Sequence, residues 1–274
     1  MSFPRNFVLV RHGESEGNAA MRMAERGDPD ALRKAFEGRH TSQFRLTDLG
    51  VEQAAAAGAW LRQEFFENGG GFDRCYTSQY VRAMETAALL ELPNAEWYRN
   101  FYLAERDSGG IEQRPEHARD EEFRTMLGMR TIEPFFWRPS NGESIAQMCL
   151  RLDRVQDTLH RECSDGNVVA VCHGEVMWGF RVLVERLAQE TFRDLYLSKD
   201  PANRIHNCQI LHYTRADPDD PLAPSTPHVN WMRMVRPTTT PVWTTGWRKI
   251  ERTRHSNEDL RRIVETHPRT LSSK

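Results

Sequence analysis

The stretch FVLVRHGE at residues 7–14 is the most informative part of this chain of 274 residues, because VVAVCHGE at residues 168–175 repeats its pattern. Each stretch is a short apolar run that ends in His-Gly-Glu. Such runs are typical of strands buried on both faces of a parallel sheet, and ligands bind where these strands end. A strand that merely ends in a polar turn would account for one such motif more readily than for two. We therefore expect His12 and His173 to meet at one edge of a sheet.

Arg11 precedes the first of these histidines and gives the motif its chemical character. A guanidinium stays protonated and presents a planar fork of donors that matches phosphate oxygens. The glycine after each histidine lets the backbone bend, and its amide can face an anion. The chain contains no HExxH, CxxC or acidic EF-hand loop. We therefore predict phosphoryl chemistry with no metal ion and no other cofactor.

A second group of candidate residues lies in TSQYVRAMET, residues 77–86, just after a predicted strand. Ser78 is a good N-cap for a helix that should run to about residue 90. Arg82 then lies near the first turn, where the helix dipole disfavours a cation. This position is poor for helix stability and suitable for holding an anion. A solvated surface arginine is the alternative.

A third candidate is Glu105, which lies in the loop LAERDSGG at residues 103–110. A phosphate ester that loses its alkoxide needs a proton donor. A carboxyl group whose pKa is raised by anionic or apolar surroundings can supply the proton. Considered alone, Glu105 is equally well explained as one of 39 acidic residues on a polar surface.

Together these motifs resemble those of the histidine phosphatase superfamily, in its phosphoglycerate mutase-like branch, over most of residues 7–213. Five motifs match in family order: RHG at residues 11–13 with Asn18, Arg82-Ala83 with Thr86, Glu105 in LAER, NGES at residues 141–144, and His173-Gly174. A single Arg-His-Gly would be a weak signal, whereas five motifs in this order are a strong one.

The resemblance implies a three-layer α/β/α sandwich with a mostly parallel central sheet, and a mechanism that the residue chemistry supports. His12 would attack phosphorus and form a phosphohistidine. Glu105 would protonate the leaving oxygen and then activate water. The phosphate oxygens would be neutralised by Arg11, Asn18, Arg82 and His173. No metal ion is required, because arginines and a histidine supply the positive charge.

Three departures from the mutase pattern bear on the reaction. Residues 19–38 look like an inserted helical excursion, and the aromatic-rich segment of the mutases is replaced by RHTSQF at residues 39–44. Between Glu105 and Asn141 we find no paired-arginine segment of the kind that grips phosphoglycerate. We therefore favour a phosphomonoester hydrolase that acts on a small phosphorylated metabolite. A phosphoglycerate-type mutase is the second hypothesis, and a non-catalytic, phosphate-binding regulatory protein is the third.

The coarse pattern alternates strands with helices and predicts one α/β domain over residues 1–215. The predicted strands lie near residues 6–10, 72–77, 95–98, 167–172 and 208–213. The predicted helices lie near residues 47–67, 79–91, 116–129, 143–163 and 175–188. The first of these helices opens at Thr47.

Residues 216–274 form a basic C-terminal extension beyond the family resemblance, with an irregular linker at 216–227, a possible edge strand at 229–235 and a polar helix near 257–266. From residue 233 onward ten basic residues face four acidic ones, so the tail opposes the net charge of −2. The extension also contains Trp231, Trp243 and Trp247. We expect it to fold back across the domain or a second subunit, bringing cations near the pocket. A solvated tail is the alternative.

The net charge of −2 gives no general attraction to nucleic acid or to an anionic membrane. No apolar run approaches membrane-spanning length, and we expect no secretory leader. The five cysteines show no paired spacing, which favours reduced and mostly buried thiols. We therefore expect a cytoplasmic protein whose partner is a small phosphorylated substrate, with a homo-oligomer left open.

Overall fold

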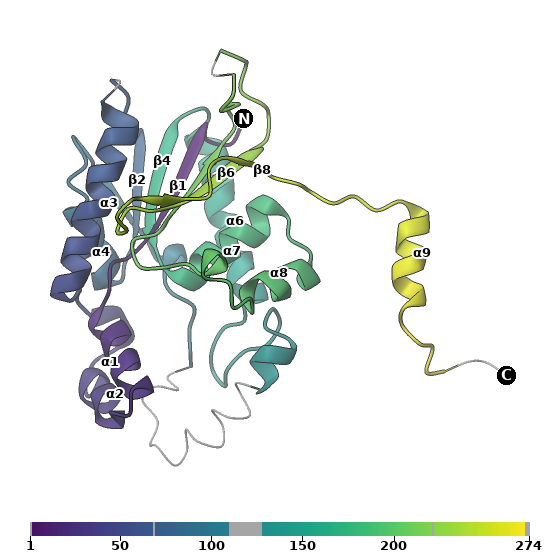
Figure 1. Ribbon diagram of the computed structural model, residues 1–274, viewed down its shortest axis with the longest axis horizontal. Helices are drawn as coiled ribbons and strands as arrows, with labels where there is room; N and C mark the ends of the chain where they lie inside the picture. Colours follow the sequence, from purple (N-terminus) through teal and green to yellow (C-terminus); the bar gives the residue numbers. More distant parts are fainter. Residues whose placement is uncertain (1, 68, 110–127, 221, 272–274) are drawn as a thin grey trace.

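The central sheet has the strand order β3-β2-β4-β1-β5-β6-β7, with β8 beside β6. A computed structural model describes residues 2–67, 69–109, 128–220 and 222–271 (Figure 1). The strands are β1 (Asn6–Arg11), β2 (Arg74–Ser78), β3 (Trp97–Asn100), β4 (Asn167–Cys172), β5 (Ile210–Thr214), β6 (Trp231–Arg236), β7 (Trp243–Thr244) and β8 (Arg248–Lys249). The first four strands run parallel to one another, and β5 runs antiparallel to β1. This mixed, mostly parallel sheet confirms the predicted fold class.

β4 lies between β1 and β2, so the two strands with the repeated motif are direct neighbours. They pair in parallel over their whole length, and Arg11 is opposite Cys172 in the register. His12 and His173 each follow one of these paired residues. The predicted meeting of the two histidines at one sheet edge is therefore confirmed.

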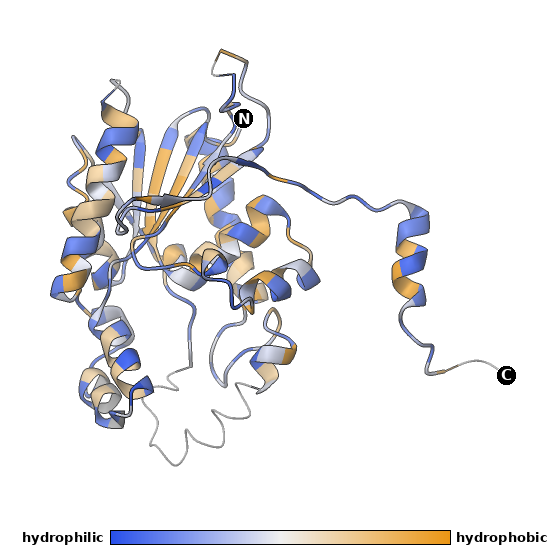
Figure 2. Cartoon of the chain, viewed as in Figure 1, coloured by the Kyte–Doolittle hydropathy of each residue, from blue (hydrophilic) through white to orange (hydrophobic). Residues whose placement is uncertain are grey.

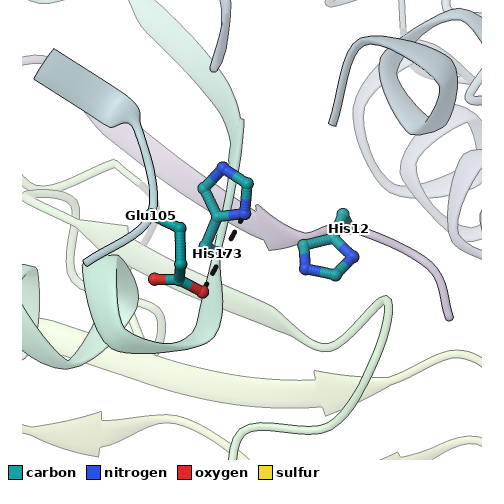
Figure 3. A group of neighbouring side chains, drawn as sticks. All are labelled: His12, Glu105 and His173. Carbon is teal, nitrogen blue, oxygen red and sulfur yellow. Dashed lines mark ion pairs between the residues drawn. The ribbon is translucent and has the colours of Figure 1, made fainter. Parts of the chain in front are cut away.

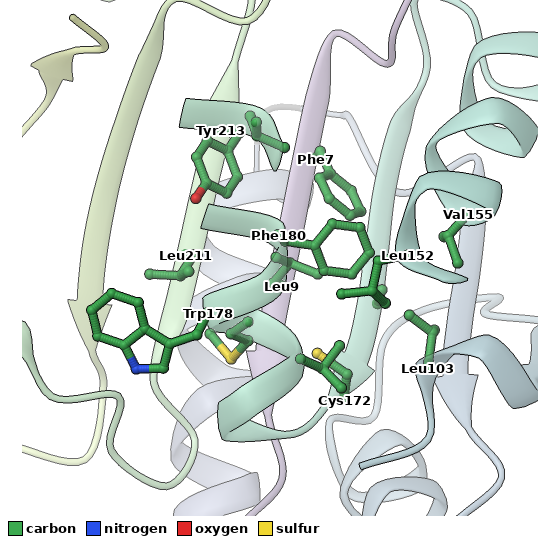
Figure 4. Packing of buried hydrophobic residues seen from close by; sticks show 14 of the residues in the cluster. Phe7, Leu9, Leu103, Leu152, Val155, Cys172, Trp178, Phe180, Leu211 and Tyr213 are labelled. Carbon is green, nitrogen blue, oxygen red and sulfur yellow. The ribbon is translucent and has the colours of Figure 1, made fainter. Parts of the chain in front are cut away.

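Helices cover both faces of the sheet, which explains the near-continuous apolar runs. Phe7 and Leu9 of β1 face a core shared with α6 (Ile145–Glu162) and α7 (Gly174–Glu185), as Figure 4 shows. Val8 and Val10 face the opposite core, shared with α3 (Asp48–Phe66) and α4 (Val81–Leu89). In Figure 2 the hydrophobic residues gather along the middle of these strands.

The helices predicted at 47–67, 79–91, 143–163 and 175–188 are present as α3, α4, α6 and α7, with small shifts at their ends. Thr47 caps α3 and Ser144 caps α6, each by accepting a backbone N–H in the first turn. Two helices occupy most of the predicted insertion, α1 (Glu16–Glu25) and α2 (Pro29–Phe36). A further helix, α8 (Gln189–Tyr196), follows α7. The helix predicted at 116–129 lies almost entirely outside the described residues.

The prediction that Ser78 caps the helix of Arg82 is wrong. Strand β2 continues through Ser78, and α4 begins at Val81 with Tyr80 as its N-cap residue. The Ser78 hydroxyl is engaged with His173, which comes from a neighbouring strand. A residue that looks like a local cap is thus used for a long-range contact.

The C-terminal extension adds strands to the same sheet. The strand predicted at 229–235 is present as β6, but the prediction of an edge strand is wrong, because β6 pairs with β5 on one side and with β7 and β8 on the other. The chain leaves the domain after Arg252, whose guanidinium donates to the carbonyl oxygens of Val184 and Val229. Helix α9 (Asn257–Glu265) then lies apart from the domain, and none of its side chains is buried (Figure 1).

All five cysteines are buried and free, as their isolated spacing predicts. In the parts of the chain that the structure describes, no helix combines the length and the apolar composition needed to cross a bilayer.

Candidate active site

His12 is held in one tautomer at the end of β1, where its side chain is almost fully buried. Its Nδ1 lies 2.6 Å from the carbonyl oxygen of Gly13. A carbonyl can only accept, so Nδ1 carries the proton and Nε2 presents a lone pair. Arg82 donates to this lone pair from its Nε at 3.1 Å. The ring is therefore a neutral base with Nε2 facing a cation.

Arg82 is fixed from two sides in the first turn of α4. Its Nη1 donates to the carbonyl oxygen of Thr41 at 2.7 Å, in the single turn η1 (Thr41–Gln43) that follows the insertion. Its guanidinium lies 4.9 Å from the ring centroid of Tyr80. The predicted place of Arg82 near a helix start at the sheet edge is thus confirmed, and its buried charge faces the His12 ring.

The amide of Gly13 does not face the pocket as an anion-binding group, although the sequence suggested this role. Its amide donates to Oγ1 of Thr86 at 3.0 Å and is not free for an anion. A Cβ at this position would lie 2.4 Å from the carbonyl oxygen of Gly50 in α3. Glycine is needed here because the end of β1 and the start of α3 pack backbone against backbone.

His173 faces His12 across the pocket, with ring centroids 5.1 Å apart. Its Nε2 lies 2.8 Å from Oγ of Ser78. The buried Nδ1 has no hydrogen-bond partner among the described residues, and it lies 3.9 Å from Oε2 of Glu105 (Figure 3). If Ser78 donates its hydroxyl proton to Nε2, Nδ1 carries a proton that is available to a bound oxyanion.

The electrostatics of the pocket favour neutral imidazoles and shift the carboxyl group of Glu105 toward its protonated form. Burial lowers the pKa of His12 well below its ordinary value, and the charges of Arg82 and Arg11 lower it further. The pKa of His173 is lowered well below its ordinary value by burial and the neighbouring Arg82. Burial raises the pKa of Glu105, although Arg82 opposes this shift. These directions suit a nucleophilic base and a proton donor.

Arg11 and Asn18 line the other side of the pocket. Arg11 donates from Nη1 to the carbonyl oxygen of Ile205 at 2.6 Å, while its buried Nε has no hydrogen-bond partner in the described part of the chain. Asn18 belongs to the capping box of α1, and its Oδ1 accepts from Ser15. Oδ1 also lies 3.2 Å from Nδ2 of Asn207. Because its oxygen is occupied, Asn18 has its amide nitrogen left as a donor.

Asn207 is a pocket residue that the sequence did not reveal. Besides contacting Asn18, its amide donates to the backbone carbonyl of His12 at 3.1 Å. It lies just before β5, in a loop with no motif of its own. Its partners are more than 180 residues earlier in the chain. The only available signal was its place before a predicted strand that could pair with β1.

Beyond Glu105 the pocket wall carries a network of charges around Glu175. The carboxylate of Glu175 accepts from Tyr196 at 2.7 Å and from Arg130 at 3.2 Å, and it lies 3.7 Å from Nη1 of Arg106. Arg106 and Arg130 are thus both associated with a carboxylate of the protein itself.

His12, Glu105 and His173 offer ligand atoms within 4.8 Å of one another, a grouping that could hold a metal ion. The charges of Arg82 and Arg11 oppose a cation at this place, because they already disfavour protonation of both imidazoles. The same charges favour a bound anion. The cluster is therefore better suited to a phosphoryl group than to a metal ion.

Comparison with known proteins agrees with this geometry. The sequence profile of the histidine phosphatase superfamily (branch 1) matches residues 7–214. A 2,3-bisphosphoglycerate-dependent phosphoglycerate mutase of Methylorubrum populi is 29% identical over 206 residues, which cover 71% of this chain and 85% of the mutase.

A second relative, the rat 6-phosphofructo-2-kinase/fructose-2,6-bisphosphatase 4, is 27% identical over 203 residues, covering 74% of this chain and 37% of the relative. Among solved structures, a mycobacterial glucosyl-3-phosphoglycerate phosphatase in complex with VO3 shares the fold, with a TM-score of 0.56 and 21% identity over 76% of this chain and 90% of the phosphatase. The profile match spans the chain from β1 to β5, including His12, Arg82, Glu105 and His173, and it shows that this chain belongs to the histidine phosphatase superfamily.

Proposed function

We propose that this protein hydrolyses phosphomonoesters of small metabolites through a phosphohistidine on Nε2 of His12. The observation that carries the proposal is the fixed tautomer of His12. Nδ1 donates to Gly13, so the Nε2 lone pair points at Arg82 in a pocket with positive charge. A bound phosphoryl group would take over the donation from Arg82 and place phosphorus against Nε2.

The reaction then follows from the positions of the side chains. The Nε2 lone pair attacks phosphorus, and the bond from phosphorus to the ester oxygen breaks. Glu105 gives its proton to that oxygen. In the second step a water attacks phosphorus while the Glu105 carboxylate takes a proton from the water. The N–P bond breaks, inorganic phosphate is released, and neutral His12 is regenerated.

Charge neutralisation in both steps is assigned to the remaining pocket residues. Arg11 has a free Nε, Asn18 has a free amide nitrogen and His173 has an unpartnered Nδ1 in the described part of the chain. These donors, with Arg82, would bind the equatorial oxygens of the transferred group. No metal ion is needed in this scheme.

A mutase is the second candidate, because the relatives of this chain include phosphoglycerate mutases. Hydrolysis is supported by two of the described arginines after Glu105, Arg106 and Arg130, which are already associated with Glu175. Arginines held in this way are less available to grip a carboxylated acceptor.

One experiment separates these possibilities. We expect inorganic phosphate release from 4-nitrophenyl phosphate without any primer, and an acid-labile phosphoryl group on the protein in rapid-quench samples. A reaction that interconverts phosphoglycerates and depends on 2,3-bisphosphoglycerate would instead identify a mutase. The absence of both activities together with phosphate binding would favour a regulatory protein.

A further inference from the structure

The carboxyl end of β6 brings a second group of cations to the sheet edge where the phosphate pocket lies. Val10 of β1 pairs with Ile210 of β5, and Ile210 pairs with Val235 of β6. Both β1 and β6 are antiparallel to β5, so they point in the same direction. Arg11 and Arg236, at the ends of these strands, therefore leave the sheet at the same edge.

The loop at residues 204–208 spans the distance between these two arginines. Ile205 is bound to the pocket, because its carbonyl oxygen accepts from Nη1 of Arg11 at 2.6 Å. Asn207 is bound to the pocket through the carbonyl oxygen of His12. The residue between them, His206, contacts β6 instead.

The contacts of His206 cannot all be satisfied at once. Its Nε2 lies 3.2 Å from the carbonyl oxygen of Pro201 and 3.3 Å from Nη1 of Arg236. The carbonyl requires a proton on Nε2, whereas the guanidinium requires a lone pair there. Besides burial, the charges of Arg236, Arg11 and Arg204 lower the pKa of His206. The His206 ring thus lies among positive charges, and its Nε2 can form only one of the two hydrogen bonds, to Pro201 or to Arg236.

Arg236 has no counter-charge among the residues that the structure describes. It stacks over Trp243 at 3.9 Å from the ring centroid, its buried Nε has no hydrogen-bond partner among these residues, and it forms no ion pair with any described carboxylate. Arg233 on the same strand differs, because it forms an ion pair with Glu64. Arg236 is partly buried, with its Nε shielded from solvent, and a shielded guanidinium nitrogen without a partner favours a ligand that accepts from it.

We propose that His206 and Arg236 bind a second anionic group of the substrate, beside the phosphoryl group held at Arg11. The preferred substrates are then phosphomonoesters that also carry a carboxylate or a second phosphate. The anion accepts from Arg236 and stabilises the protonated form of His206, which frees Nε2 to donate to Pro201. This inference rests on the proposed phosphatase function and names its substrate class.

Two matched compounds test the inference, glycerol 3-phosphate and 3-phosphoglycerate, which differ by the carboxylate. We expect wild-type kcat/KM for phosphate release to be higher for 3-phosphoglycerate. Arg236→Gln should reduce that preference by roughly tenfold to a hundredfold, the range for a hydrogen bond to a charged group. Arg233→Gln removes an equal charge from the same strand and should leave the preference within about twofold, even if it lowers thermal stability.

Fructose 6-phosphate and fructose 1,6-bisphosphate form a second pair, and a preference confined to this pair identifies the anion as phosphate. A wild-type enzyme without a preference in either pair overturns the inference, as does an Arg236→Gln variant that loses the activities on both compounds of a pair equally. If the wild type releases phosphate from none of these compounds, the proposed hydrolysis fails. Calorimetric binding of the same pairs to wild type and Arg236→Gln then tests the second anion site on its own.

Discussion

Arg82 donates from its Nε to Nε2 of His12 over 3.1 Å, so the arginine occupies the lone pair that would attack phosphorus. The contact keeps Nε2 directed into the pocket before substrate arrives. A phosphate oxygen is a better acceptor for a guanidinium than a neutral imidazole, because it carries charge. Binding of a phosphoryl group would therefore release the nucleophile at the place where it is used.

Removal of the nucleophile should abolish the phosphoenzyme. We expect His12→Ala to lower kcat by about a thousandfold or more, which corresponds to roughly 4 kcal/mol of activation free energy. The fold should survive, because the ring lines the pocket and is not part of either hydrophobic core. Rapid-quench phosphate labelling checks the assignment, and an acid-labile phosphoryl group on the variant would contradict it.

The proton donor can be identified because the loss of turnover on its removal should depend on the leaving group. Glu105→Gln should lower turnover of an alkyl phosphate by roughly a hundredfold to ten-thousandfold. The loss with 4-nitrophenyl phosphate should be much smaller, since that leaving group departs without a proton. Steady-state kinetics with both substrates provide the measurement. Equal losses would assign the proton transfer to another group.

The pH profile should have two limbs with opposite signs. The ring of His12 must be unprotonated, and its pKa lies well below 6.5, so kcat/KM rises with pH in the acidic range. Glu105 must be protonated, and burial raises its pKa above the ordinary value, so kcat/KM falls as pH rises through this raised pKa. We expect an optimum between the lowered pKa of His12 and the raised pKa of Glu105. Replacement of Glu105 by glutamine should remove the falling limb, and a falling limb that persists would point to another acid.

Chelation tests whether His12, Glu105 and His173 act without a metal ion. Because Arg11 and Arg82 provide the positive charge, we expect EDTA treatment followed by gel filtration to leave kcat unchanged. Activity that falls on treatment and returns with Zn²⁺ or Mn²⁺ would show that the three ligand atoms bind a metal ion in the working enzyme.

Two truncations should separate the parts of the C-terminal extension. A chain that ends after Ala216 lacks β6, in which Met232, Met234 and Val235 are buried. This loss should cost on the order of 5 kcal/mol, comparable with the whole stability of a domain.

A chain that ends after Thr253 lacks only residues beyond the Arg252 contacts, and its free energy of unfolding should change by less than about 0.5 kcal/mol. Thermal denaturation measures the stability of both truncated chains. If the chain that ends after Thr253 is also destabilised, α9 packs against the domain in solution. If the full-length protein is an oligomer in solution and this truncated chain is a monomer, α9 mediates association.

The elements that the sequence predicted well are those with local signals. The apolar run before His12 has partners on both faces of the sheet, and the Thr47 and Ser144 caps lie beside the helices that they begin. Ser78 was misassigned because its partner, His173, is 95 residues away. No local pattern reports such a contact.

The same reason explains the site residues that were missed. The pairing of β5 with β1 brings Asn207 to the pocket, and the pairing of β5 with β6 brings Arg236 to the same sheet edge. The strands β7 and β8 contain two residues each, too few for a periodic pattern. The main site residues were predictable because the family motifs are local in sequence. The positions of Asn207 and Arg236 could not be predicted, because they depend on the order of the strands in the sheet.

The position of β4 between β1 and β2 also constrains how the protein is made. During synthesis β1 emerges first, but its partners are residues 167–172 of β4 and 210–214 of β5. The first three strands thus have no continuous sheet to join until most of the chain has left the ribosome. Pairings of such sequence separation are slow to form and leave strand edges exposed meanwhile. The nascent enzyme would therefore be unable to bind phosphate and would depend on protection from aggregation until the chain is nearly complete.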